Sequence, residues 1–597
     1  MLPRIIFLLS LIFLLQCTSK TTEIPTKKIY EFQTRYKMTY DRLTTNVFHP
    51  VFSESFILAD VNINPENPRR FSEFSGDLSG RYIEAMSIAA KDKDLEFLHK
   101  IVAKTLTYQK SDGRFGNPEL NFRQNEITGE HMALLWGNGR MLVGLLEYYN
   151  RFQDSNVLNA AIKLGDFYLT VYDACATPET IQKLEGFGAQ GIICFTQYIE
   201  GMVRLAEITG RKNYLDVCMN VYPLLPERKK QHSHGFLTTL RGVLLMNEYT
   251  RDLKQLEYVI KQYDDLINSS DFTIYGSVAE YFGGKGMRDE GCASSDFVRL
   301  GLELFRITGD HKYLETAEFA MFNAFYFNQY KTGDFGHHIL SSNLLAYTHN
   351  PGKVKINYNG AAPSYPMAAW WCCTMHGMRC FSYLNDQMIN ILGDSAFLNL
   401  YIEADFKDDE FIITSSRLKS EKFTMLFQLD IENNDNKTIY LRKPTWAAEI
   451  EIFLNNQNVE FSIVNNYIKV NENINSQDIL QVGFNFSPNV SERFNRDADR
   501  NKGISSRLTY GPFLMGIDDN TDPAFTAEPN NNKISLGSIQ PIMSSEKING
   551  YDKSFYLEAE YHHSGFPSNL KTVFRPVKNL TFEKRPALFL EFDFIKK

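Results

Sequence analysis

The sequence contains no long run of lysine and arginine. Its formal net charge is -8 at pH 7 and its isoelectric point is near 5.9, so it offers no basic field to a phosphate backbone. This balance argues against nucleic acid as a partner. Beyond residue 15 the sequence also contains no apolar segment long enough to cross a membrane. Any contact with a membrane is therefore expected at the N-terminus.

The N-terminal residues have the organisation of an export signal. A basic residue precedes an apolar run over residues 5–15, which is too short to span a bilayer but has the length of a signal peptide. The run ends in Leu-Leu-Gln-Cys at Cys17, which is similar to the processing site of bacterial lipoproteins, where the cysteine is lipidated. We predict a signal peptide over 1–16, a lipid anchor and tether over 17–45, and a location in the periplasm or outer membrane. Cleavage without lipidation is the alternative, because a small residue is usual at the position of Gln16.

Cysteine is scarce, with eight in 597 residues. If Cys17 is lipidated, an odd number is left, so the remaining cysteines cannot all pair. They are Cys175, Cys194, Cys218, Cys292, Cys372, Cys373 and Cys380. An exported protein of this size needs no disulfide scaffold. Thiols that stay free are therefore candidates for chemistry or for metal binding.

The helical part of the chain is built from repeated pairs. Apolar residues recur at helical spacing from about residue 80 to 392, and short polar turns separate the segments. Residues 205–215 and 304–314 share one form, in which a helix ends, a glycine turn follows and a new helix begins. Such hairpins return at intervals of roughly forty to sixty residues, which is typical of helical repeats. We predict an (α/α)6 toroid, a ring of six helical hairpins, over residues 46–394; an open solenoid is the alternative.

After about residue 395 the pattern changes to short alternating apolar and polar runs. Examples are 411–414, 424–429 and 449–453, separated by turns rich in Asn, Asp and Gly. This predicts one or more β-sandwich domains over 395–597. The predicted fold class is thus multidomain α+β, with the chemistry in the helical domain.

Two local patterns supply metal-binding side chains. One contains Glu290 and Cys292, and the other contains the adjacent Cys372 and Cys373. Zinc prefers four ligands drawn from Cys, His and carboxylate, so these residues would complete one tetrahedral site. The alternatives are a disulfide within the Cys-Cys pair, buried unreactive thiols, or a purely structural zinc. His376 is a possible substitute ligand.

This combination of Glu-x-Cys with a later Cys-Cys resembles glycoside hydrolase family 127, the β-L-arabinofuranosidase family. Residues 441–446 and 507–513 are similar to β-domain signatures of the same family, and the resemblance covers most of residues 60 to 520. It implies a retaining glycosidase with Cys372 as the nucleophile and Zn2+ held by the Glu and the three Cys. A coordinating thiol is deprotonated, so zinc would keep the nucleophile ready.

A retaining mechanism also needs a carboxylic acid that protonates the leaving oxygen and then activates water. The resemblance places this acid upstream of the Glu-x-Cys, where the sequence offers Glu280. Asp289 is the reserve candidate. The alternative is that Glu280 is a solvated or salt-bridged residue, as most glutamates are.

The residues expected to bind the sugar differ from the family pattern. The family grips arabinofuranose with histidines, and we place three of those positions at Arg81, Gly139 and Gln197, whereas His234 is retained. Arginine can hold a carboxylate through paired hydrogen bonds, so we hypothesise that Arg81 and Arg140 bind a carboxylate-bearing or otherwise unusual sugar; structural salt bridging is the alternative. Aromatic residues beside the site could form a stacking wall or belong to the core: Trp370, Trp371, Tyr281 and Phe282.

Together these features predict an anchored exo-acting hydrolase that releases a terminal sugar from plant-type oligosaccharides. Two alternatives stay open. A polysaccharide lyase can also join a toroid to β-sheets but needs a Tyr or His base and gives no role to the Cys-Cys pair. A non-catalytic glycan-binding lipoprotein would keep zinc for structure alone.

Overall fold

The computed structural model describes most of the helical domain and large parts of the β-domains. Structural statements below refer to these residues: 28–29, 31–47, 51–62, 71–186, 188–225, 228, 231–274, 276–283, 289–330, 332–337, 339–341, 344–346, 369–418, 422–431, 437–471, 473–494, 504–517, 532–535, 539–542, 547–548, 551–552, 555–563, 567–579, 587–589 and 593–595. None of the helices in these ranges has the length and apolarity that a transmembrane span requires.

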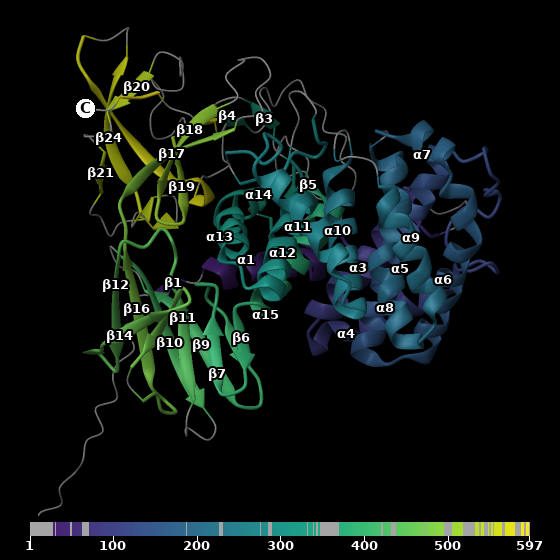
Figure 1. Cartoon of the computed structure of the whole chain (residues 1–597), viewed down its shortest axis with the longest axis horizontal. Coiled ribbons are helices and arrows are strands. Elements are labelled where there is room, and N and C mark those ends of the chain that lie inside the picture. Colours follow the sequence, from purple (N-terminus) through teal and green to yellow (C-terminus); the bar gives the residue numbers. More distant parts are fainter. Residues whose placement is uncertain are drawn as a thin grey trace, which may run out of the picture.

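Six inner helices form a closed ring. Each helix packs against the next, and the last packs against the first. In order they are α3 (Asp77–Ala89), α5 (Gly129–Phe152), α8 (Ile199–Thr209), α10 (Ser233–Thr250), α12 (Gly291–Thr308) and α15 (Trp371–Asp386) (Figure 1). The predicted toroid is therefore confirmed, and the open solenoid is not the fold.

Six outer helices surround this ring. Five of them each follow an inner helix directly: α4 (Asp92–Thr107), α6 (Ser155–Cys175), α9 (Lys212–Val221), α11 (Leu253–Ile267) and α13 (His311–Ala320). The sixth is α1 (Glu31–Thr44), which packs on α15. The sixth hairpin is thus assembled from the two ends of the helical domain.

The position of α1 corrects the predicted tether. Residues 31–44 belong to the toroid, because Phe32, Tyr40 and Leu43 are buried and the Phe32 ring lies 5.6 Å from the Phe381 ring of α15. The prediction was wrong from residue 31 because the apolar face of this helix is narrow and the rest of it is polar. Signal peptide, Cys17 and the first part of the tether lie outside the described residues.

The predicted helix–turn–helix punctuation is confirmed. Gly210 and Gly309 end α8 and α12 in the left-handed conformation, with φ of 71° and 70°. Asp310 then caps α13 by accepting a hydrogen bond from the Lys312 amide at 3.0 Å. The left-handed glycine is common to both turns, whereas α9 begins at Arg211 without a side-chain cap.

Two sheets form the first β-unit; all their strands follow the helical domain in the chain except β1, which precedes it. One has the order β1-β9-β10-β16-β12-β13, with β8 also paired to β9, and the other has the order β14-β15-β11-β7-β6. The strands of the first are β1 (Lys28–Ile29), β8 (Asp405–Lys407), β9 (Phe411–Leu418), β10 (Phe423–Ile431), β12 (Glu449–Leu454), β13 (Gln457–Asn458) and β16 (Ile479–Asn485). Those of the second are β6 (Ile389–Leu392), β7 (Ser395–Leu398), β11 (Thr438–Arg442), β14 (Phe461–Val464) and β15 (Tyr467–Val470).

A third sheet forms the C-terminal β-unit. Its order is β17-β18-β19-β25-β24-β20-β27, with β21 paired to β24. The strands are β17 (Pro488–Phe494), β18 (Ile504–Tyr510), β19 (Phe513–Gly516), β20 (Asn532–Ser535), β21 (Gln540–Pro541), β24 (Leu557–His563), β25 (Leu570–Pro576) and β27 (Asp593–Ile595). Both β-units lie on one side of the helical domain (Figure 1), which confirms the predicted order of domains.

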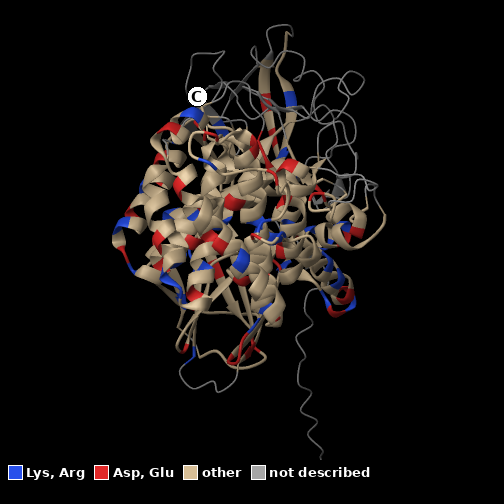
Figure 2. Cartoon of the chain, turned by 90° about the vertical axis from the view of Figure 1, so that its right-hand side faces the viewer, with Lys and Arg blue, Asp and Glu red and all other residues tan. Residues whose placement is uncertain are grey.

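Further short α-helices and strands connect these elements. The helices are α2 (Glu54–Ile57), α7 (Pro178–Leu184) and α14 (Tyr326–Asn328). The strands are β2 (Phe335–Gly336), β3 (Ile339–Ser341), β4 (Leu344–Ala346), β5 (Ala369–Trp370), β22 (Lys547–Ile548), β23 (Tyr551–Asp552) and β26 (Ala587–Phe589). Seen from the helical side, acidic and basic residues are interspersed (Figure 2).

The two β-domain signature segments fasten the β-units to the toroid. In the first, Arg442 ion-pairs with Glu318 of α13, and the Trp446 indole donates to the same carboxylate at 2.9 Å. In the second, Asn323 donates to the Pro512 carbonyl at 3.0 Å and accepts from the Leu514 amide at 2.7 Å. These motifs therefore carry interdomain contacts.

Candidate active site

Two helix N-termini bring the predicted metal ligands together. Glu290 is the N-cap residue of α12 and Cys292 is the second residue of that helix; Cys372 and Cys373 are the second and third residues of α15. Gly291 lets the helices approach, because a Cβ there would lie only 2.9 Å from the Cβ of Cys373. The dipoles of both helices favour negative charge at this point.

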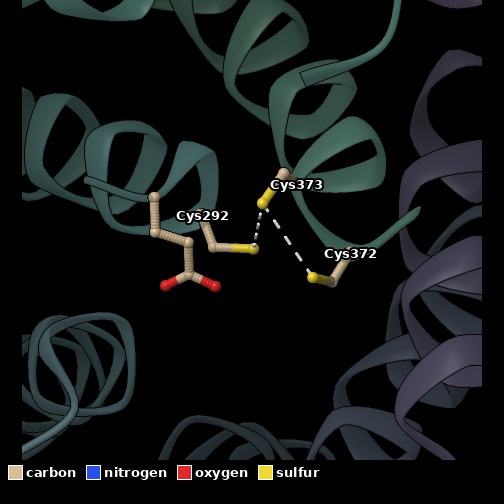
Figure 3. Close-up of side chains that lie close together, drawn as sticks. Cys292, Cys372 and Cys373 are labelled. Atoms are coloured by element: carbon tan, nitrogen blue, oxygen red, sulfur yellow. Dashed lines mark hydrogen bonds between the residues drawn. The ribbon is translucent and has the colours of Figure 1, made fainter. Parts of the chain in front are cut away.

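The spacing of the sulfur atoms fits one four-coordinate metal site. The Cys292 and Cys373 sulfurs are 3.7 Å apart and those of Cys372 and Cys373 are 4.0 Å apart (Figure 3). A disulfide needs about 2.05 Å, so the three thiols are free, whereas Zn–S bonds of about 2.3 Å place tetrahedral sulfurs about 3.8 Å apart. One oxygen of Glu290 and the three sulfurs all lie within 4.8 Å of one another. The structure thus brings all four predicted ligands together.

Cys372 is the thiol of this group that is held ready for deprotonation. Hydrogen bonds from Cys292 and Cys373, aided by the positive charge of Arg81, lower the pKa of the Cys372 thiol well below its usual range. Burial instead raises the pKa of Cys292 and of Cys373 well above the usual range. Cys372 is also the one member of the group that is not fully buried. It therefore combines access with thiolate character, as a nucleophile requires.

Arg81 lies beside this cluster, but its guanidinium is engaged by protein groups. It donates to Asp77 at 2.6 Å, to His376 at 2.9 Å and to His234 at 2.9 Å, and it lies 3.9 Å from the Cys292 sulfur. The paired hydrogen bonds that a sugar carboxylate would need are thus already used. In this structure Arg81 connects side chains of the site by hydrogen bonds and does not present its guanidinium to a sugar carboxylate.

His234 and His376 act as acceptors for Arg81. His234 donates through Nδ1 to Asp296, 2.5 Å away, which leaves Nε2 to accept from Arg81. Burial and the charge of Arg81 lower the pKa of both histidines, so both imidazoles are neutral. His234, Asp296 and His376 also lie close enough to hold an ion, but the guanidinium already occupies the nitrogens that would bind it. His376 is part of this group rather than a substitute ligand of the cysteine site.

Glu280, the predicted acid/base, is buried in the segment between α11 and α12. Its carboxylate lies 4.0 Å from the Nε2 atom of His232 and 3.8 Å from that of His337. His232 is in turn 3.7 Å from the Glu290 carboxylate, so one imidazole connects the proposed acid to the metal-ligand group. The reserve candidate, Asp289, is paired by a backbone bridge to Ala279 next to Glu280.

Sequence reasoning missed His232 and His337. His232 stands only two residues before the predicted His234, in a His-Ser-His sequence at the start of α10, and this spacing was the available signal. No nearby residue in the sequence marks His337 as a site residue. It directly follows β2 and lies near Glu280 only in the folded chain. Asp296 was likewise missed; it lies one helical turn after Cys292 on the same face of α12.

Gln197 and Arg140, predicted to bind substrate, have structural contacts. Gln197 donates to the carbonyl of Gly235 at 2.9 Å and so joins two inner helical segments. Arg140 is buried 3.9 Å from Glu200 and donates to the Gln197 carbonyl at 3.4 Å. At Gly139 a Cβ would lie 2.8 Å from the Gln197 backbone, so a histidine does not fit there. The altered positions support the helix packing below the site.

The aromatic residues divide into core and rim. Phe282 is buried against Phe236, with ring centroids 5.6 Å apart, and Trp371 is buried against Phe71 at 5.2 Å. Tyr281 is partly exposed and packs edge-on against His232 at 5.1 Å. Trp370 is also partly exposed and packs on His337. Tyr281 and Trp370, rather than Phe282 and Trp371, therefore offer rings beside Glu280.

A network of ion pairs fills the toroid below the site. It connects all six inner helices; within it Arg241 bridges three carboxylates and Arg379 bridges two. Its members are Glu84, Arg140, Glu147, Glu200, Arg204, Arg241, Asp296, Arg299, Glu303 and Arg379. In the described part of the chain, the ring therefore has a polar floor that is occupied by ion pairs, and the cysteine cluster lies at the N-terminal ends of α12 and α15.

Comparison with protein families gives two matches. The model of the β-L-arabinofuranosidase GH127 catalytic domain matches residues 31–386, and the model of the GH127 middle domain matches residues 395–486. The first match begins at α1, in agreement with its place in the toroid. A comparison with curated proteins finds no match.

Solved structures of two GH127 enzymes share the fold of this chain. A GH127 β-arabinofuranosidase has a TM-score of 0.69 at 16% identity, and the match covers 95% of this chain and 96% of the other. A GH127 β-L-arabinofuranosidase from Geobacillus stearothermophilus T6 has a TM-score of 0.70 at 14% identity, covering 95% of this chain and 99% of the other. At these identities the likeness shows the fold over nearly the whole chain.

Proposed function

Since this chain belongs to glycoside hydrolase family 127 and is a glycoside hydrolase, we propose that it is a retaining exo-enzyme that releases a terminal sugar from plant-type oligosaccharides, as a β-L-arabinofuranosidase does. The observation that carries this proposal is the convergence of Glu290, Cys292, Cys372 and Cys373 within 4.8 Å at the meeting point of two inner helices. A lyase needs no such cluster, which favours hydrolysis.

The four residues fit zinc, and we propose Zn2+ as the cofactor. They supply one carboxylate and three thiolates at tetrahedral spacing. When bound, the metal stabilises the thiolate form of its cysteine ligands at neutral pH. His232 beside Glu290 orients the carboxylate ligand, as outer partners of metal ligands commonly do.

In the first step we assign the nucleophile to Cys372 and the acid to Glu280. The Cys372 sulfur attacks the anomeric carbon, a C–S bond forms, and the bond from that carbon to the leaving oxygen breaks. Glu280 gives its proton to the leaving oxygen, so the aglycone departs as a neutral alcohol. Arg81 holds the two neutral histidines by hydrogen bonds and lies 3.9 Å from the Cys292 sulfur of the same cluster.

In the second step the roles at Glu280 reverse. Its carboxylate takes a proton from water, whose oxygen attacks the anomeric carbon while the C–S bond breaks. The sugar leaves with its original anomeric configuration, and Cys372 returns to the thiolate. The occupied floor of the toroid supports exo action, because a chain cannot thread through the ring past the ion-pair network.

Metal analysis of the purified soluble domain tests the cofactor. We expect about one zinc per chain, because the site has four ligands, and a loss of that zinc in Glu290→Gln together with a lower melting temperature. Asp264→Asn, on the outer helix α11, is the control and should retain the metal. Absence of zinc, or a disulfide between Cys372 and Cys373 in the native protein, would contradict the proposed mechanism and favour the glycan-binding alternative.

We also propose that Cys17 is lipidated and anchors the enzyme at the cell envelope. The support is the apolar run that ends at this cysteine in the sequence. We expect the expressed full chain to incorporate labelled palmitate and to partition into a detergent phase, and Cys17→Ser to do neither. A mature chain that is cleaved near residue 17 but carries no lipid would support simple secretion instead.

A further inference from the structure

The proposed acid/base is carried by a short hairpin rather than by a helix. Phe272 and Val278 form an antiparallel bridge, and inside it the Thr273 amide donates to the Ser277 carbonyl at 2.9 Å. The hydroxyls of Thr273 and Ser277 are also 2.9 Å apart. Glu280 follows this hairpin by two residues. These three interactions join residues 272–274 to residues 276–278 in a unit that leads directly to the acid.

The base of this unit is fixed to the toroid. The Glu280 carbonyl accepts hydrogen bonds from both the amide and the hydroxyl of Ser233, at 2.8 and 3.1 Å. The Phe272 ring stacks on Phe297 of α12, with centroids 4.8 Å apart. The backbone of Glu280 is therefore held at one end by α10 and at the other by the hairpin.

The tip of the hairpin is held by the C-terminal β-unit. Arg507 leaves strand β18 and donates through Nη1 to the carbonyl of Ile274 at 3.3 Å. Its guanidinium lies over the ring of Phe319 on α13, 4.2 Å from the centroid, and its Nε donates to Ser491 at 3.1 Å. Arg507 is only 9% exposed. Three contacts thus fix the guanidinium: the hydrogen bond to the hairpin, the hydrogen bond to Ser491 and the stacking on Phe319.

The hairpin tip also packs closely against α13. Gly276 has φ of 80°, and a Cβ there would meet the Phe319 ring at 3.0 Å, so the tip lies directly on the ring that Arg507 covers. Arg507 and Phe319 together form a socket built from the β-unit and the toroid. This socket is next to a crevice of about 360 Å³ lined by both parts.

We propose that Arg507 is a positioning residue for the acid/base, so that the C-terminal β-unit takes part in catalysis by setting the place of Glu280. The inference rests on the proposed role of Glu280 and assigns to the β-unit a task in the reaction. Arg507 does not touch the reacting atoms. Loss of its hydrogen bond frees the hairpin tip, and a displaced acid gives its proton less efficiently to the leaving oxygen.

This role has a kinetic signature that general destabilisation does not have. Protonation by an acid matters most when the leaving group is a poor one, such as a sugar or an alkyl alcohol. A nitrophenolate leaves with little help. A misplaced acid should therefore lower kcat/KM for an alkyl or disaccharide β-L-arabinofuranoside far more than kcat/KM for the 4-nitrophenyl glycoside, with KM nearly constant.

The test compares Arg507→Met with wild type in the full soluble protein on both substrates. For the substrate with the poor leaving group we expect kcat/KM to fall about 10- to 100-fold, since a displacement of about 1 Å can cost 10²-fold. For the 4-nitrophenyl glycoside we expect kcat/KM to fall less than about threefold. Thr509→Val, two residues along β18 on the same crevice, is the control and should leave both values unchanged. Arg507→Lys keeps a cation near Phe319 and should recover part of the loss; it carries the test if the methionine variant does not fold.

Equal losses on the two substrates, or no loss on either in a folded variant, would overturn this inference while leaving the proposed function intact. A wild-type protein that hydrolyses neither substrate would instead overturn the proposed function. Zinc content should be the same in wild type and in every Arg507 variant, which separates an effect on the acid from an effect on the metal site.

Discussion

Replacing Cys372 by serine is expected to lower kcat by about 10⁴-fold or more on any substrate, because removal of a covalent nucleophile leaves only binding and electrostatic assistance. The serine hydroxyl is not a thiolate and stays protonated at neutral pH. The helix start that holds position 372 should not change, since serine is well tolerated in the first turn. Circular dichroism should therefore match that of wild type, whereas the melting temperature is expected to fall as in Glu290→Gln, because Cys372 is one of the four proposed zinc ligands.

A second cysteine on the same helix provides the matched control. Cys380 lies two turns after Cys372 and is fully buried in the core of α15, where burial raises the pKa of its thiol. Cys380→Ala should cost some stability but retain most of the activity. If Cys372→Ser turned over substrate at a rate near that of wild type, the nucleophile would have to be sought elsewhere and the cluster would be a structural metal site.

The metal-ligand group was predicted from its residue types and from the family resemblance, and the structure shows that its residues occupy two helix starts. An N-cap Glu followed by Cys, and a Cys-Cys pair in the first turn of another helix, place four ligands at helix N-termini whatever the loops between them do. What the sequence could not provide was the approach of α12 to α15, which depends on Gly291. The resemblance implied that the two motifs meet, and the structure brings their ligand atoms within 4.8 Å of one another.

The rest of the site could not be predicted because it depends on three-dimensional packing. Arg81 was a candidate sugar ligand, yet each of its three nitrogens donates to a protein group, namely Asp77, His234 and His376, which come from three different inner helices. The residues around a single arginine in the sequence do not show whether it binds a sugar or makes structural hydrogen bonds. The same holds for His337, which meets Glu280 only when β2 is placed.

The closure of the toroid was also beyond local patterns. Among the five hairpins that are continuous in the chain, the turns at Gly210 and Gly309 have a clear glycine signal, and these turns were predicted. The sixth hairpin pairs α15 with α1, more than three hundred residues earlier in the chain. Because α1 is largely polar, its residues were predicted to belong to the N-terminal tether. Only the ring geometry shows that a sixth outer helix is needed at that place.

Replacing Glu280 by glutamine is expected to separate the two halves of the reaction. For a disaccharide substrate, kcat/KM should fall by about 10² to 10⁴-fold, the usual contribution of a general acid. For the 4-nitrophenyl glycoside, kcat/KM should change little, because nitrophenolate needs no proton. Its kcat should fall, because water now attacks the glycosyl-Cys372 intermediate without a base, and a burst of nitrophenol should precede slow turnover.

An external nucleophile that needs no base should restore this second step. We expect azide to raise kcat of Glu280→Gln on the nitrophenyl glycoside and to give the glycosyl azide with retained anomeric configuration, because azide replaces water on the same face of the sugar. Asp289→Asn is the control, since Asp289 is buried next to the same backbone bridge but is not the assigned acid. If azide rescued Asp289→Asn and not Glu280→Gln, the acid/base would be Asp289, and the two imidazoles beside Glu280 would have a structural purpose instead.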